Sequence, residues 1–186
     1  MEEKKVKDIM IPIKEYATVH ENDTLLDVIK VLDECNRKIP EGQYKLRSVL
    51  VVNRSGKIIG KIAHLGFLKA LEPKYDHMPA LDELSSSGLS SDYLQSIMRN
   101  MNLWDDAFCE YCDIAERAEI IQVHEVMDPI NKNINADASI FDAIHKIIMW
   151  NMLSIPVTRN HEVVGIIRQA DIYKEISEYI KNSCKQ

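Results

Sequence analysis

The sequence VKDIM at residues 6–10 returns in altered form as VHEVM at residues 123–127. Each copy is followed by a similar helix start, DTLLD at 23–27 and ASIFD at 138–142. In both starts a Thr or Ser hydroxyl can accept a hydrogen bond from the third helical N–H, while the acid three residues later reaches back. Internal repetition of this kind indicates that the chain contains two copies of one structural unit.

The two copies continue in the same order, with a helix, a hairpin and a second helix. Apolar residues at helical spacing and short β-branched runs bounded by turn residues carry this prediction. The helices are expected near 25–32, 65–71, 140–148 and 170–180, and the hairpins at 48–62 and 154–167. With the strand before each helix, the unit is strand, helix, strand, strand, helix, which places the chain in the α/β (α+β) class. One copy alone has little apolar surface for a core, so the two are expected to pack sheet against sheet.

The two copies are separated by an acidic insert. We divide the chain into a first copy at 1–71, an insert at 72–122 and a second copy at 123–186. The insert contains three basic and eleven acidic residues, so it holds all of the net charge of −6 and leaves the copies mildly basic. Two helices are expected in it, and a lid, a dimer contact, a partner surface and a plain solvated decoration all fit its composition. The first copy also carries about ten extra residues within 36–47, where Pro40 and Gly42 predict a surface loop.

Composition and motifs exclude several classes of protein. The negative net charge disfavours nucleic acid as a partner, and no apolar run is long enough to span a membrane. No secretory signal follows Met1, and four cysteines fit a reducing cytoplasm better than a disulfide framework, so a cytoplasmic protein is expected. Cys109 and Cys112 form a single CxxC within a helical pattern and are interpreted as free thiols. The sequence contains no G-x-S-x-G hydrolase motif, no phosphate-binding P-loop and no metal-ligand spacing. It therefore indicates no enzyme.

In their order these features resemble a tandem pair of CBS (cystathionine β-synthase) domains, often called a Bateman module. The resemblance covers about 6–71 and 123–180 and rests on the VKDIM opening, the capped helix, the hairpin with its Gly, and IPV at 155–157. It implies two β-α-β-β-α units related by pseudo-twofold symmetry, two clefts between them, and a homodimer. It also implies a regulatory module that binds AMP, ADP, ATP or S-adenosylmethionine and signals to a protein partner in trans.

The family's nucleotide motif, G-h-x-[T/S]-x-x-[D/N], corresponds to GIIRQAD at 165–171. Gly165 and Asp171 match, and the resemblance assigns Asp171 to the ribose hydroxyls, although a helix N-cap is the alternative role. Arg168 replaces the hydroxyl residue, and it could bind phosphate, point away or fill the pocket. By resemblance, Ile134, Met152, Leu153, Pro156 and Ile166 would contact the base, with Lys132 as a possible phosphate partner.

The first copy departs further from the motif. Its segment at 60–66 reads GKIAHLG, and Ala63 and Gly66 supply neither the hydroxyl nor the carboxylate. We therefore expect that cleft to be empty or to take a different ligand. The weakened motifs support a rival hypothesis, a protein interaction or dimerisation module with vestigial clefts and the acidic insert as its working surface.

Overall fold

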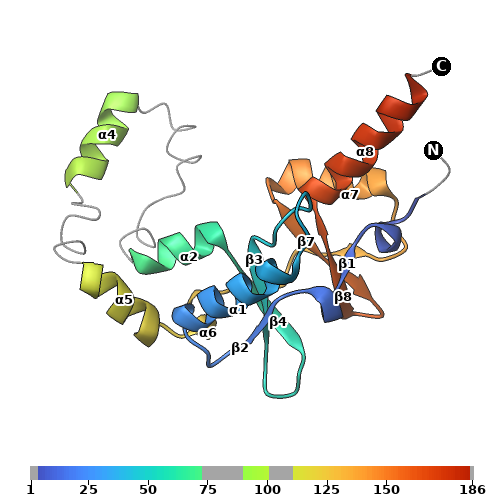
Figure 1. Cartoon of the computed structure of the whole chain (residues 1–186). Helices are drawn as coiled ribbons and strands as arrows, with labels where there is room; N and C mark the ends of the chain where they lie inside the picture. Colours follow the sequence, from blue (N-terminus) through green and yellow to red (C-terminus); the bar gives the residue numbers. More distant parts are fainter. Residues whose placement is uncertain (1–3, 73–89, 101–110, 185–186) are drawn as a thin grey trace.

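The computed structural model describes residues 4–72, 90–100 and 111–184 (Figure 1). Within them, the strands form two four-stranded sheets, in the orders β2-β3-β4-β5 and β1-β8-β7-β6. The first sheet contains β2 (Thr18–His20), β3 (Ser48–Val52), β4 (Ile58–Ala63) and β5 (Asp128–Pro129). The second contains β1 (Ile11–Pro12), β8 (Glu162–Arg168), β7 (Ser154–Arg159) and β6 (Ile134–Asn135). The mixed α+β class and the two-repeat plan are confirmed.

The helices follow the predicted order. They are α1 (Leu25–Lys38), α2 (His64–Leu71), α4 (Ser91–Asn100), α5 (Tyr111–Ile120), α6 (Val123–Val126), α7 (Ile140–Trp150) and α8 (Gln169–Ser183), with 3-10 turns η1 (Val6–Asp8) and η2 (Ile13–Glu15). The backbone N–H of Asp27 donates to Thr24 Oγ1 at the start of α1, and that of Asp142 donates to Ser139 Oγ at the start of α7. Both predicted capping boxes are therefore present.

In each sheet, one edge strand comes from the other half of the chain. β1 lies near the N-terminus but pairs antiparallel with β8, and β5 follows the insert but pairs antiparallel with β4. The remaining pairings are the same in both repeats, with β2 parallel to β3 and β6 parallel to β7, each followed by an antiparallel hairpin. The repeated VKDIM and VHEVM segments thus lead into the strands that cross from one repeat to the other.

The exchanged edge strands explain why β8 and β4 each contain a glycine, at Gly165 and Gly60. Gly165 in β8 lies under the crossing strand, and a Cβ there would be 2.6 Å from the Ile11 carbonyl oxygen and 2.8 Å from Met10 Sδ. Gly60 is its counterpart in β4, where a Cβ would meet the Met127 side chain alone. The Met that ends each repeated segment therefore packs on the glycine of the other repeat's last strand.

The apolar cores are also shared between the repeats. One cluster is built on first-repeat residues such as Leu25 and Val49, but it includes Ile166 of β8. The other is built on second-repeat residues such as Ile140 and Ile155, but it includes Val6 of the N-terminal segment. These four core side chains and both exchanged ones are fully or almost fully buried, so each half contributes to the stability of the other.

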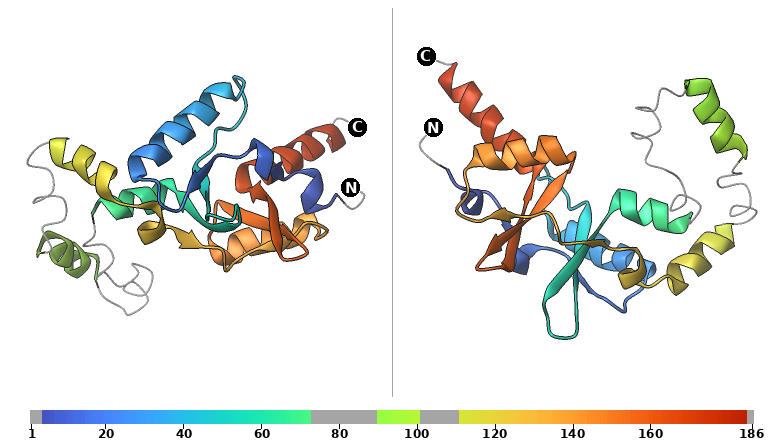
Figure 2. Two further views of the ribbon diagram at one scale, coloured as in Figure 1. Left: turned by 90° about the horizontal axis from the view of Figure 1, so that it is seen from below. Right: turned by 180° about the vertical axis from the view of Figure 1, so that it is seen from behind.

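Both insert helices are present where the structure describes them. α4 is described from Ser91 to Asn100, whereas residues 101–110 of the insert, including Cys109, lie outside the described residues. α5 packs against α1 and α2, and the backbone N–H of Leu25 donates to the Ile121 carbonyl at 3.1 Å. In both views of Figure 2, α4 and α5 lie at the end of the molecule away from α8. None of the described helices combines the length and apolarity needed to cross a membrane.

Candidate functional site: the seam around Arg168

The two polar residues of the predicted nucleotide motif form an ion pair. Arg168 ends β8 and Asp171 lies in the first turn of α8, so the three-residue spacing brings their side chains together. Arg168 Nε and Nη2 each donate to one Asp171 carboxylate oxygen at 2.6 Å. The side chains are only 13% and 18% exposed. The N-cap position of α8 is Arg168, so Asp171 is not the N-cap residue.

The remaining guanidinium nitrogen reaches the first repeat. Arg168 Nη1 donates to the carbonyl oxygens of Tyr44, at 3.0 Å, and Lys45, at 3.3 Å. Both carbonyls belong to the loop of extra residues that the sequence places before the first hairpin. Arg168 therefore binds a carboxylate of its own repeat and the backbone of the other repeat simultaneously.

A buried tyrosine lies next to this pair. The Tyr16 hydroxyl and Ser48 Oγ are 2.7 Å apart and hydrogen-bonded. Burial raises the pKa of Tyr16, while the nearby charges of Arg168 and Asp171 act on this pKa in opposite directions. Tyr16 also shares an apolar cluster with Ile166. We call the residues Tyr16, Tyr44, Lys45, Ser48, Ile166, Arg168 and Asp171 the Arg168 seam.

The symmetry-related seam is filled by a lysine. Lys61 occupies the position in β4 that Ile166 occupies in β8, and it is 7% exposed. Its Nζ donates to the carbonyl oxygen and Oγ of Ser154, at 3.1 and 3.2 Å. Burial lowers the pKa of Lys61, and the Asp128 carboxylate partly offsets this effect. The Lys61 side chain thus occupies the second seam beside Ser154.

The structure brings several of the predicted site residues close to one another. Ile166, Arg168 and Asp171 meet in the Arg168 seam, and Gly165 supports the crossing strand beside them. Pro156 is buried on β7 directly opposite Ile166, and the Leu153 carbonyl accepts from the Gln169 N–H at 2.9 Å, although Leu153 is 62% exposed. Ile134 and Met152 pack in the second repeat's core, and the Lys132 ammonium lies 5.9 Å from the Trp150 ring centroid.

Sequence reasoning missed the first-repeat side of the seam. Tyr16 and the Tyr44 and Lys45 carbonyls belong to segments that precede strands of the first sheet, and Ser48 is the first residue of β3. The pseudo-twofold relation between the repeats could have indicated these residues. It places the last strand of one repeat against the start of the other repeat's hairpin. Lys61 and Ser154 show the same relation in the second seam.

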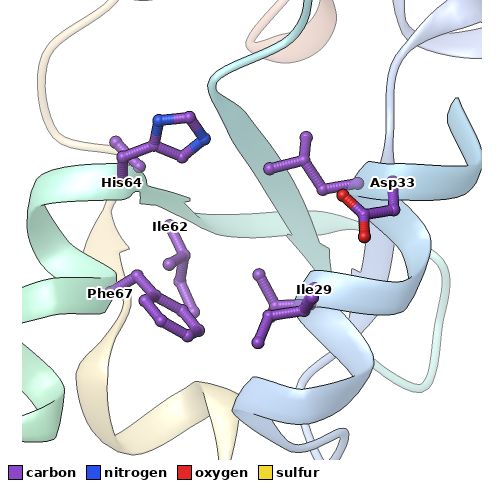
Figure 3. Close-up of a pocket in the computed structure, with 8 residues that line it drawn as sticks. Ile29, Asp33, Ile62, His64 and Phe67 are labelled. Atoms are coloured by element: carbon purple, nitrogen blue, oxygen red, sulfur yellow. The ribbon is translucent and has the colours of Figure 1, made fainter. Parts of the chain in front are cut away.

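A pocket of about 200 Å³ lies between α1 and α2 and over β4 (Figure 3). Ile29, Ile62 and Phe67 form its apolar part, while Asp33 and His64 lie toward one side of it. Among the described residues, no group of His, Cys, Asp and Glu is arranged to hold a metal ion. The pocket lies on the first repeat and includes Ile62, Ala63 and His64 of that repeat's altered motif segment at 60–66.

Residues 6–72 and 123–178 match the family model of the CBS domain. The chain belongs to the CBS domain family. Its fold is shared by CBSX2, a CBS-pair protein from Arabidopsis thaliana, with a TM-score of 0.61 and 13% identity over 96% of this chain and 98% of that one. A crystal structure of CBSX2 in complex with AMP gives a TM-score of 0.57 and 14% identity over 94% and 97% of the two chains.

The CBS domain of a membrane protein from Sphaerobacter thermophilus is also similar, with a TM-score of 0.57 and 20% identity over 92% of this chain and 87% of that one. None of the curated proteins matches the sequence. The tandem CBS pair inferred from the repeat is therefore confirmed, and at these identities the structural likeness concerns the fold.

Proposed function

We propose that this CBS pair is a cytoplasmic regulatory module that binds a phosphorylated adenosine at the Arg168 seam and signals its occupancy to a protein partner in trans. The observation that carries the proposal is the Arg168–Asp171 pair, half-enclosed between the two repeats. It offers a carboxylate and a cation a few ångströms apart, which are the groups needed for a ribose and a phosphate.

The existing hydrogen bonds leave room for both ligand groups. An ionised carboxylate has about four lone-pair positions, and Arg168 donates to one on each oxygen of Asp171. Ribose hydroxyls can donate to the others. Arg168 Nη1 donates only to neutral carbonyl oxygens. A phosphate oxygen is a stronger, charged acceptor, so it can replace these carbonyls without breaking the ion pair.

The same chemistry predicts a preference among adenosine compounds. AMP, ADP and ATP bring a phosphate to the guanidinium, whereas adenosine brings none. S-adenosylmethionine places a sulfonium cation where the phosphate would lie, and its positive charge is repelled by Arg168. The complex of CBSX2 with AMP supports the nucleotide over the sulfonium compound.

We propose further that the module is a homodimer, formed through its helical face. Large apolar side chains on α2, α7 and α8 are exposed to an unusual degree, and burying them in a dimer would stabilise it. They are Leu65, Leu68, Phe141, Ile148, Met149 and Tyr173, each between 53% and 70% exposed. This face, together with Lys61 in the second seam, also favours a second candidate function, an interaction or dimerisation module without a ligand.

A thermal-shift series distinguishes the two functions. A ligand at 100 times its dissociation constant adds about 2.7 kcal/mol to the free energy of unfolding of a one-site protein. For a chain of this size that corresponds to a rise in melting temperature of roughly 5–10 °C. We expect AMP, ADP or ATP at millimolar concentration to give it, and adenosine and S-adenosylmethionine to give less.

The controls are two acidic residues of α8. Asp171→Ala should abolish the shift, whereas Glu178→Ala, which removes an exposed acid further along the helix, should leave it unchanged. Absence of any nucleotide shift in the unmodified chain would refute ligand sensing and leave the interaction module. A shift that survives Asp171→Ala would place the ligand outside the Arg168 seam.

A further inference from the structure

We infer that the extra loop of the first repeat, residues 40–46, is a strap that Arg168 holds closed, and that a bound phosphate releases it. The inference rests on the proposed function, because the phosphate belongs to the ligand proposed above. It assigns a role to the extra residues that the first repeat carries between its first helix and its hairpin. In the second repeat only three residues, 151–153, connect α7 to β7.

One end of the strap is tied to α1. The Lys45 ammonium donates to the carbonyl oxygens of Asn36 and Ile39, at 2.8 and 2.7 Å, where the last carbonyls of α1 have no helical partner. The Asn36 side chain accepts from the Leu46 backbone N–H at 2.7 Å and donates to the Leu46 carbonyl at 3.0 Å. Movement of the strap would therefore remove the cation and the hydrogen bonds that stabilise the end of α1.

Arg168 ties the strap to the second repeat. Its Nη1 donates to the Tyr44 and Lys45 carbonyls, so a guanidinium contact across the seam joins the motif of the second repeat to the loop of the first. The strap residues around these carbonyls are exposed, apart from Leu46, which is 2% exposed. Few buried apolar contacts hold such a segment, so a small number of hydrogen bonds decides whether it is ordered.

Ligand and strap compete for the same nitrogen. Nε and one N–H of Nη2 bind Asp171, while Nη1 donates to the two strap carbonyls. A phosphate that binds the outer edge of the guanidinium through Nη2 and Nη1 together therefore has to displace a strap carbonyl. A charged phosphate oxygen is the stronger acceptor, so it displaces the carbonyls of Tyr44 and Lys45. Occupancy of the seam is then converted into opening of the strap and loosening of the end of α1. α1 lines a pocket together with α2, and α2 carries Leu65 and Leu68 of the proposed dimer surface, which gives the signal a route to a partner.

Hydrogen exchange measured by mass spectrometry on the full chain tests this coupling. In the ligand-free protein, Arg168→Ala should accelerate exchange across 40–46 by about tenfold, the effect of losing roughly one to two hydrogen bonds. Exchange in the hairpin turn at 53–56 should not change. Arg54→Ala, an exposed arginine in that turn, is the matched control and should leave the strap as protected as before. Arg168→Lys preserves the charge but cannot bind Asp171 and both carbonyls, so it should also open the strap if the alanine variant does not fold.

AMP at a saturating concentration should raise strap exchange in the unmodified chain to the level of the Arg168 variants. If AMP raises the melting temperature but leaves the strap protected, the coupling is wrong and the proposed function stands. If AMP does not bind at all, the proposed function fails and release by ligand fails with it. Strap exchange that is unchanged in folded Arg168 variants would show that Arg168 does not hold the strap.

Discussion

Removing the Arg168–Asp171 pair tests the seam in the absence of any ligand. We predict that Arg168→Ala and Asp171→Ala each destabilise the chain, and that the double variant is less destabilised than the sum of the two. The reason is that each single variant leaves its partner's charge half-buried without a counter-charge, whereas the double variant removes both charges. The difference is the coupling energy of the pair.

The geometry sets the size of this coupling. The two side chains are 13% and 18% exposed, so the pair lies between a surface ion pair, which contributes up to about 1 kcal/mol, and a fully buried one, whose rupture costs about 3–5 kcal/mol. Two short charge-assisted hydrogen bonds join it. The bonds to Tyr44 and Lys45 do not enter this coupling, because they are lost with Arg168 in both the single and the double variant and the cycle subtracts them. We therefore expect a coupling of about 2 kcal/mol.

Urea unfolding of the unmodified chain, both single variants and the double variant gives the four free energies that the cycle needs. Each single variant should lower the melting temperature by roughly 4–8 °C, as expected for about 2 kcal/mol in a chain of this size. A coupling below about 0.5 kcal/mol, the level at which independent sites add, would contradict a paired Arg168 and Asp171.

Further substitutions test the shared fold. Gly165→Ala should cost about 1–3 kcal/mol, and more than Gly60→Ala, because it forces a methyl against a backbone carbonyl of the crossing strand rather than against a movable Met side chain; chemical denaturation of both variants compares them. Thr24→Ala and Ser139→Ala should each cost about 1 kcal/mol by the same method through loss of a helix cap, and no change in either would show that the capping boxes are not stabilising. The pKa of Tyr16 is raised above its usual 10.0, so the stability it contributes is present below pH 10 and lost as pH rises through the folded-state pKa. The unmodified chain should therefore lose stability above pH 10 more steeply than Tyr16→Phe, and equal slopes would contradict a buried phenol.

The parts of the fold with a strong local signal could be predicted from the sequence. Thr24 and Ser139 start their helices as expected because a cap needs only residues three positions apart. The hairpins follow from β-branched runs with a turn between them. The exchanged strands β1 and β5 could not be predicted, because two residues are too short to show a strand's alternating pattern.

Only the second-repeat residues of the Arg168 seam could be predicted from the sequence. Arg168 and Asp171 are close in sequence and lie within a family motif, so they could be named in advance. Tyr16 and the Tyr44 carbonyl come from the other repeat and meet them only through packing of the two sheets, which no local pattern encodes. The base contacts assigned to Ile134, Met152, Leu153, Pro156 and Ile166 stay a prediction.

A crystal structure of the chain grown with AMP tests the central claim most directly. The account predicts ribose hydroxyls within hydrogen-bonding distance of the Asp171 carboxylate, the phosphate on Arg168 Nη1, and the Tyr44 and Lys45 carbonyls moved away from it. AMP bound beside Lys61 and Ser154, or a seam that keeps its carbonyl contacts and holds no nucleotide at saturating concentration, would contradict it.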